Sequence, residues 1–211
     1  MNDDPGARAP RRKDRTLTPD RAAPRGLEVR PYRPDDAPAW LRCRALSFLQ
    51  TAYFDDVLVA KPTYHGAPIE LVACDGPSLV GVIDVSAQPG EATIETIAVH
   101  PDWMRRGVGS ALLDEVRTRL PATVRTLDAW TRDDEQANGW YQRQGFAETF
   151  RYLHVYAISD AEVEAAIVKA GHGLTPARAF FHAGIAAEAA LRGTFERVHV
   201  CRRYELVLAT P

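Results

Sequence analysis

The segment that most limits the possible folds of this chain is VHPDWMRRGVGSALLDEV, residues 99–116. The apolar run that precedes it, residues 92–99, predicts a strand. After a short loop, apolar residues recur at helical spacing at Val108, Leu112, Leu113, Val116 and Leu120. A loop that leaves a strand and opens a helix presents unpaired backbone N–H groups at the positive end of the helix dipole. The segment therefore predicts an anion-binding turn between a strand and a helix.

The composition of this loop suits a phosphate. Gly107 and Gly109 would let the anion approach the backbone, while Arg105 and Arg106 would supply positive charge beside it. A Walker loop requires a lysine after its last glycine, and none follows here. A dinucleotide-binding fingerprint requires a third glycine, where this chain has Leu112. Taken alone, the loop leaves open a strand-to-helix turn that holds no ligand.

Turn residues and periodicity divide the rest of the chain into alternating elements. Strands are expected over 27–33, 69–74, 79–85, 92–99, 126–131, 146–158 and 197–208, and helices over 34–48, 108–120 and 133–145. Asp35 or Asp36 would cap the first helix. The stretch DGPS predicts that strands 69–74 and 79–85 form an antiparallel hairpin. Residues 53–58 are ambiguous, with a second short helix as one alternative.

A larger connection separates the last two expected strands. Residues 159–171 begin with a capping box, Ser159 and Glu162, and residues 175–193 begin with Thr-Pro and end at a glycine. Both stretches are expected to be helices. About 35 residues are too few for an independent core, so we expect a two-helix insertion, at about 159–195, within one domain.

The composition limits the classes of protein to which this chain can belong. Residues 1–25 contain seven Lys/Arg, four Asp/Glu and four Pro, and we expect a disordered leader rather than a basic arm or transit peptide. Residues 26–211 are expected to form a single domain. The net charge of −2 does not favour nucleic acid or an acidic membrane, and no apolar run is long enough to span a bilayer, so a cytoplasmic protein is expected. Cys43, Cys74 and Cys201 lack metal-ligand spacing, and we expect reduced thiols and no metal.

Two stretches together resemble a known family. IETIAVHPDWMRRGVGSALL resembles the acetyl-coenzyme A motif of the GNAT superfamily of N-acetyltransferases, Gln/Arg-x-x-Gly-x-Gly/Ala. DEQANGWYQRQGF is similar to the second signature of that family, with matches at Ala137, Tyr141, Gly145 and Phe146. Met104 departs from the Gln or Arg that the family often has. Because phosphate contacts in this loop come largely from backbone N–H groups, we expect this change to matter little. The resemblance covers the element order of residues 27–208.

The resemblance implies the fold and the position of a cofactor. The fold would be α/β, the acyl-CoA N-acyltransferase fold: a mixed, mainly antiparallel twisted sheet with helices on both faces, splayed between strands 92–99 and 126–131. Acetyl-coenzyme A would lie in that opening. Its pantetheine arm would pair with the backbone of Ile97, Ala98 and Val99, and its pyrophosphate would meet Arg105, Arg106, Gly107, Val108, Gly109 and Ser110.

Acetyl transfer to an amine requires a base for the amine and an acid for the leaving thiolate. The resemblance assigns the acid to Tyr141, which alternatively is an aromatic residue packed on the sheet. It assigns the base to Glu95, which alternatively is a solvated strand residue; Asp84 and His100 are weaker candidates for the same role. Asp134 stands where the family commonly has Asn and would cap the following helix or hold Tyr141 through water near the cofactor.

The acceptor would enter opposite the cofactor, beside the segment after the first helix and the insertion. Aromatic and acidic residues gather there, which suits a cationic amine, although packing is the favoured reading: Tyr53, Phe54, Asp55, Asp56, Tyr64, Phe180, Phe181 and His182. We expect acetyl transfer to a primary amine by direct attack in a ternary complex, with a small-molecule acceptor favoured. The alternatives are a protein lysine or N-terminus as acceptor, or a non-catalytic acyl-coenzyme A sensor. A homodimer is expected only by analogy.

Overall fold

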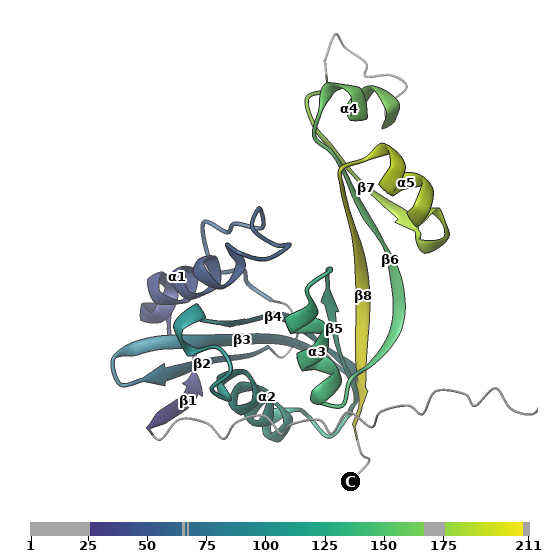
Figure 1. Ribbon diagram of the computed structural model, residues 1–211. Helices are drawn as coiled ribbons and strands as arrows, with labels where there is room; N and C mark the ends of the chain where they lie inside the picture. Colours follow the sequence, from purple (N-terminus) through teal and green to yellow (C-terminus); the bar gives the residue numbers. More distant parts are fainter. Residues whose placement is uncertain (1–25, 65, 67, 167–175, 209–211) are drawn as a thin grey trace, which may run out of the picture.

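The computed structural model describes residues 26–64, 66, 68–166 and 176–208, and the expected leader, residues 1–25, lies outside them. Figure 1 shows one twisted sheet in the order β1-β2-β3-β4-β5-β8-β6-β7. The strands are β1 (Leu27–Pro31), β2 (Ile69–Asp75), β3 (Ser78–Gln88), β4 (Gly90–Val99), β5 (Val124–Thr131), β6 (Ala147–Ala157), β7 (Ala179–Gly184) and β8 (Arg197–Val207). The helices are α1 (Ala37–Phe48), α2 (Val108–Arg119), α3 (Glu135–Arg143), α4 (Asp160–Ala166) and α5 (Glu188–Thr194). The expected mixed α/β fold is confirmed.

Strands β4 and β5 form the parallel pair of this otherwise antiparallel sheet, and they separate partway along. Their pairing runs from Gly90 opposite Val124 to Ile94 opposite Ala129 and then ends. Beyond that point β4 pairs only with β3, as far as Val99 opposite Gly81. The sheet therefore opens between β4 and β5, where the family resemblance placed the cofactor.

A bulge marks the start of this opening. Asp84 of β3 lies opposite Thr96, whereas its neighbour Val85 lies opposite Ile94. Glu95 is thus an additional residue on β4 without a partner on β3. Bulges of this kind disrupt the ladder locally and redirect a side chain, and they are common beside active sites.

Helices cover both faces of the first five strands (Figure 1). On one face α1 packs Trp40 and Cys43 against Val72, Val82 and Ala98. On the other face α2 buries Val108, Leu112, Leu113 and Val116 against the sheet. The apolar spacing that predicted this helix thus becomes its buried stripe. Asp36 precedes α1 but does not cap it with its side chain; its carboxylate instead accepts hydrogen bonds from Arg30 at 2.7 and 2.8 Å.

The close approach of α2 depends on Gly81 in β3. A Cβ atom on this residue would lie 2.7 Å from Cγ1 of Val108 and 3.0 Å from Cδ1 of Leu112. We expect Gly81→Ala to lower the free energy of unfolding by about 1–3 kcal/mol, because overpacking forces the helix away from the sheet. Urea denaturation measures this. Gly193→Ala, whose Cβ would meet nothing within 4 Å, is the control, and equal stability of the two variants would contradict the argument.

Strands β6, β7 and β8 extend beyond the first core and carry a second one beneath α4 and α5 (Figure 1). This core buries Leu153, Val155, Ala157, Val163, Phe195, Val198 and Val200. The capping box predicted for α4 is confirmed, since the Glu162 carboxylate accepts from Ser159 N at 3.1 Å and Ser159 Oγ accepts from Glu162 N at 3.4 Å. The same carboxylate accepts from Glu196 N at 2.6 Å, which joins α4 to the start of β8.

The prediction of one helix over residues 175–193 is wrong. Residues 179–184 form β7, which pairs antiparallel with β6, and only Glu188–Thr194 are α-helical. Side chains alternate along β7: Phe181 and Ala183 pack on the second core, whereas Phe180 and His182 are exposed. This period of two, in an aromatic run suited to a strand, outweighs the helix-start and helix-stop signals at either end. The short helix considered for residues 53–58 is also absent, and residues 52–55 form turns.

Candidate active site

A groove of about 400 Å³ occupies the opening between β4 and β5. Its walls come from the end of α1 and the loop after it, from β4, from the loop between β4 and α2, and from α3. The groove brings together most of the predicted site residues: Glu95, Ile97, Ala98, Val99, Arg105, Gly107, Val108, Gly109, Asp134 and Tyr141. Arg106 and Ser110 do not line it. The Arg106 guanidinium lies 5.9 Å from the centre of the Trp103 ring, and Ser110 Oγ accepts a hydrogen bond from Gln144 Nε2 at 2.9 Å.

One side of the groove is the exposed edge of β4. From Thr96 to Val99 this strand has no strand partner on the β5 side. Its peptide groups can therefore pair with an extended molecule, as an added strand would. Ser47 Oγ already donates a hydrogen bond of 2.8 Å to the Val99 carbonyl, so this oxygen has one partner.

The loop at the end of the groove has the backbone geometry of an anion site. Arg105 and Gly107 have positive φ values of 58° and 78°, and Gly107 occupies the N-cap position of α2. No side chain caps this helix. The N–H groups of its first turn have no acceptor within the helix, and they form the positive end of the helix dipole. The loop therefore fits a phosphate, with Arg105 on the groove wall.

The turn before this loop is held by His100 and Trp103. His100 Nδ1 accepts a hydrogen bond from Asp102 N at 3.2 Å, and its ring contacts Trp103 edge-on at 5.1 Å between centroids. Trp103 Nε1 in turn donates to Asp75 at 3.1 Å. His100 does not line the groove, so the structure gives it a role in the turn and not the role of a base.

Tyr141 is both packed and placed on the groove. Its side chain is only 4% exposed and stacks on Tyr204, with 5.5 Å between the ring centres. Burial, together with the nearby Tyr53 and Asp128, raises the pKa of the Tyr141 phenol well above its ordinary value. The hydroxyl thus stays protonated at neutral pH. Asp134 fixes the helix that carries it, because its carboxylate accepts from Ala137 N at 2.8 Å, which confirms the predicted cap.

Glu95 is an exposed carboxylate at the β4 bulge. Ser86 Oγ donates to Glu95 Oε1 at 2.5 Å, and the side chain lines the groove. Asp84, the alternative base, is fully buried and does not line the groove. Trp40 Nε1 donates to its carboxylate at 3.1 Å, and Lys61 Nζ lies 3.2 Å from it. Burial raises the pKa of Asp84 to about 6. Of the two carboxylates, only Glu95 can reach a molecule in the groove.

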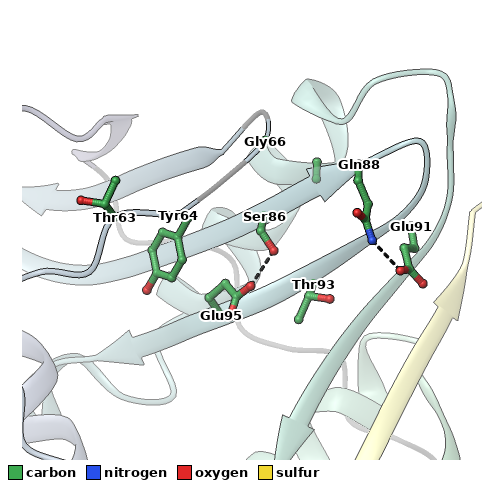
Figure 2. A pocket seen from close by; sticks show the side chains of 9 residues that line it. Thr63, Tyr64, Gly66, Ser86, Gln88, Glu91, Thr93 and Glu95 are labelled. Carbon is green, nitrogen blue, oxygen red and sulfur yellow. Dashed lines mark hydrogen bonds between the residues drawn. The ribbon is translucent and has the colours of Figure 1, made fainter.

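A second cavity, of about 320 Å³, adjoins the groove at Glu95 (Figure 2). It is lined by Thr63, Tyr64, Gly66, Ser86, Ala87, Gln88, Glu91, Thr93 and Glu95. Apart from Glu95 and Tyr64, sequence reasoning missed these residues. The available signal was the run of polar side chains on the two strands around the turn, from Ser86 to Glu95.

The acidic residues after α1 already have cationic partners. Arg197 binds both carboxylate oxygens of Asp55 at 2.8 and 2.9 Å, which lowers the pKa of Asp55 to about 2. Arg44 binds Asp56 at 2.9 Å. Tyr53 is also engaged, since its hydroxyl accepts from Arg132 N at 2.5 Å. These contacts favour the packing interpretation of this segment over a site for a cationic amine.

The family model of the acetyltransferase (GNAT) domain matches residues 69–148, which include β4, the loop, α2 and α3. The chain carries a GNAT domain. A curated mycothiol acetyltransferase from Clavibacter michiganensis subsp. michiganensis is 31% identical over 144 residues, which are 64% of this chain and 47% of that protein. The chain therefore spans about half the length of the curated relative that it matches.

Solved structures share the fold of this GNAT domain. A putative acetyltransferase from Pyrococcus horikoshii aligns over 92% of this chain and 94% of its own, with a TM-score of 0.59 and 13% identity. The PaiA N-acetyltransferase of Thermoplasma acidophilum, in complex with coenzyme A, aligns over 58% of this chain and 91% of its own, with a TM-score of 0.50 and 12% identity. At such identities the likeness concerns the fold alone.

Two further observations concern the described part of the chain. No helix there is both long and apolar enough to cross a membrane. No group of three or more His, Cys, Asp or Glu side chains within 26–64, 66, 68–166 and 176–208 is arranged to hold a metal ion.

Proposed function

We propose that this protein transfers the acetyl group of acetyl-coenzyme A to a primary amine, by direct attack within a ternary complex. The observation that carries the proposal is the groove itself. It runs along the unpaired edge of β4 to the uncapped start of α2, and Tyr141 and Glu95 both lie on its walls. The PaiA structure contains coenzyme A on the same fold, which supports this donor.

The residues of the groove fit the parts of the donor. The backbone of Ile97 and its neighbours on β4 would pair with the pantetheine arm. The first turn of α2, after Gly107, and the Arg105 guanidinium would hold the pyrophosphate. Of the predicted cofactor contacts, Arg106 and Ser110 lie off the groove wall, so the backbone and Arg105 carry most of this role.

The chemistry requires three proton transfers. Glu95 takes a proton from the acceptor ammonium, directly or through water, and the neutral nitrogen attacks the thioester carbonyl carbon. Backbone donors on β4 stabilise the resulting oxyanion. When the C–S bond breaks, the Tyr141 hydroxyl donates its proton to the sulfur, and the phenolate regains a proton, through water, from the nitrogen, which becomes the neutral amide. The products are the acetylated amine and coenzyme A with a free thiol.

A covalent acyl-enzyme has no support from the cysteines. Cys43, Cys74 and Cys201 are buried free thiols, and none of them lines the groove. Burial raises the pKa of Cys43 to about 12, which suppresses the nucleophilic thiolate. Direct transfer therefore suits the site better, in the cytoplasm, where such thiols stay reduced.

A small-molecule acceptor is the favoured form of this proposal. The 31% identical relative is named for mycothiol rather than for a protein acceptor. The test is mass spectrometry of small amines and a protein digest incubated together with acetyl-coenzyme A and the protein. A new acetylated small amine supports the proposal, whereas acetylation of peptides alone supports a protein acetyltransferase. Binding of acetyl-coenzyme A without any acetylated product would support a sensor and contradict the proposal.

The assignment of Glu95 has its own test. We expect Glu95→Gln to lower kcat/KM about 100-fold, because the amide cannot accept the proton. Glu115→Gln, on α2 and outside the groove, is the matched control. If kcat/KM of the Glu95→Gln enzyme equals that of the Glu115→Gln control, the base is water or another group.

A further inference from the structure

The second cavity has the position of an acceptor site, and its lining distinguishes between acceptors. It shares Glu95 with the groove, so a molecule bound there can present an amine to the base and to the thioester. Figure 2 shows that β3 and the start of β4 provide one wall, with Tyr64 and Thr63 beside it. Hydrogen bonds connect side chains of the two strands. Gln88 Nε2 donates to the Glu91 carboxylate at 2.6 Å, and Ser86 Oγ donates to the Glu95 carboxylate.

Most of the side chains in this lining are polar, with Gly66 and Ala87 as the exceptions. Hydroxyl groups come from Thr63, Tyr64, Ser86 and Thr93, an amide from Gln88, and carboxylates from Glu91 and Glu95. Among the residues that the structure describes, no lysine or arginine lines the cavity. Neither carboxylate forms an ion pair with a described residue, although Arg203 lies near enough to Glu91 for their charges to interact.

Two cations that interact electrostatically with residues of this lining, Lys61 and Arg203, already have acidic partners. Lys61 binds Glu70 and Asp84, and Arg203 lies 2.6 Å from Asp128. The charge on Glu91 and Glu95 is therefore available to a ligand rather than to the protein. This differs from the segment after α1, where arginines neutralise Asp55 and Asp56.

We propose, on the basis of the function proposed above, that this cavity binds the acceptor as a small polyhydroxylated primary amine, of about the size of a monosaccharide. The ammonium lies at Glu95, and the hydroxyl groups of the acceptor bond to the hydroxyl, amide and carboxylate groups of the lining. A volume of 320 Å³ is near the lower end of the range for ligand pockets. An apolar amine of the same size forms none of these hydrogen bonds, so it binds less tightly.

The test compares three amines with acetyl-coenzyme A at a fixed saturating concentration. Glucosamine represents the proposed class, cyclohexylamine has a ring of the same size without hydroxyl groups, and a short lysine peptide represents a protein acceptor. Mass spectrometry gives the initial rate for each. We expect kcat/KM for glucosamine to exceed that for cyclohexylamine by about tenfold, and to exceed that for the peptide.

Variants of the cavity separate binding from chemistry. We expect Glu91→Gln and Gln88→Met each to raise KM for glucosamine about tenfold, while kcat and the Kd of acetyl-coenzyme A stay unchanged. Glu164→Gln, an exposed substitution on α4, is the control for the loss of one negative charge. An unchanged KM in both cavity variants would overturn the proposal.

The outcomes also separate this inference from the proposed function. If the protein acetylates cyclohexylamine or the peptide as well as glucosamine, the cavity does not select the acceptor and the inference fails, whereas the acetyltransferase stands. If no amine is acetylated in this test or in the amine mixture, the proposed function fails. Calorimetric titration of glucosamine into the protein, with coenzyme A present, then tests the inference about the cavity independently of catalysis. If glucosamine does not bind, the inference is overturned.

Discussion

Gly107→Asp is expected to raise the Kd of acetyl-coenzyme A at least about 100-fold relative to Gly107→Asn. Gly107 occupies the N-cap position of α2, where the pyrophosphate is proposed to bind. A carboxylate at about 5 Å from a phosphate costs about 3 kcal/mol at the effective dielectric of a partly buried site, which corresponds to this factor. Isothermal titration calorimetry measures both constants.

The comparison of Gly107→Asp with Gly107→Asn isolates the effect of the negative charge on the affinity for acetyl-coenzyme A. Gly107 has a φ of 78°, which most side chains adopt only with strain, but Asn and Asp both tolerate this region and have nearly the same shape. Any loss of fold is therefore common to the two variants. Equal affinities of the Asp and Asn variants would show that no phosphate lies at this helix start.

Tyr141→Phe is expected to lower kcat about 100-fold or more, while the Kd of acetyl-coenzyme A changes less than about threefold. The substitution removes only the hydroxyl, which is the proposed proton donor to the leaving sulfur. Because the pKa of this phenol lies well above its ordinary value, the wild-type enzyme should show no loss of activity through Tyr141 between pH 7 and about 10. Steady-state kinetics and a pH series test both statements.

Tyr204→Phe is the matched control for this variant. Tyr204 stacks on Tyr141 and is 1% exposed, but it does not line the groove. Loss of its hydroxyl should leave kcat within a fewfold of the wild-type value. If the two variants lose kcat equally, the effect belongs to the packing of the aromatic cluster and not to proton donation.

The local signals of the sequence predicted the elements that position the groove. The apolar stripe of α2, the glycines before it and the cap at Asp134 depend on neighbours within a few residues, so periodicity and turn chemistry identify them. The failure at residues 179–184 has a different origin. Whether Phe181 packs as part of a helix or a strand depends on β6, which lies distant in sequence, and helix-end signals carry no information on that contact.

The parts of the site that were missed are also non-local. The bond between Asp55 and Arg197 joins residues 142 positions apart, and no spacing rule connects them. The second cavity forms because the segment near Tyr64 lies over the polar face of β3 and β4. Its polar strand residues are visible in the sequence, but solvated strand faces have the same appearance.

The place of β8 in the sheet has a consequence for how the protein is made. This strand is the last described element of the chain, yet it lies between β5 and β6. Until the ribosome has produced it, β5 and β6 each lack one neighbour, and the sheet exists as two separate pieces. Exposed strand edges of this kind pair readily with other chains. The nascent protein therefore exposes these two edges until β8 has been made.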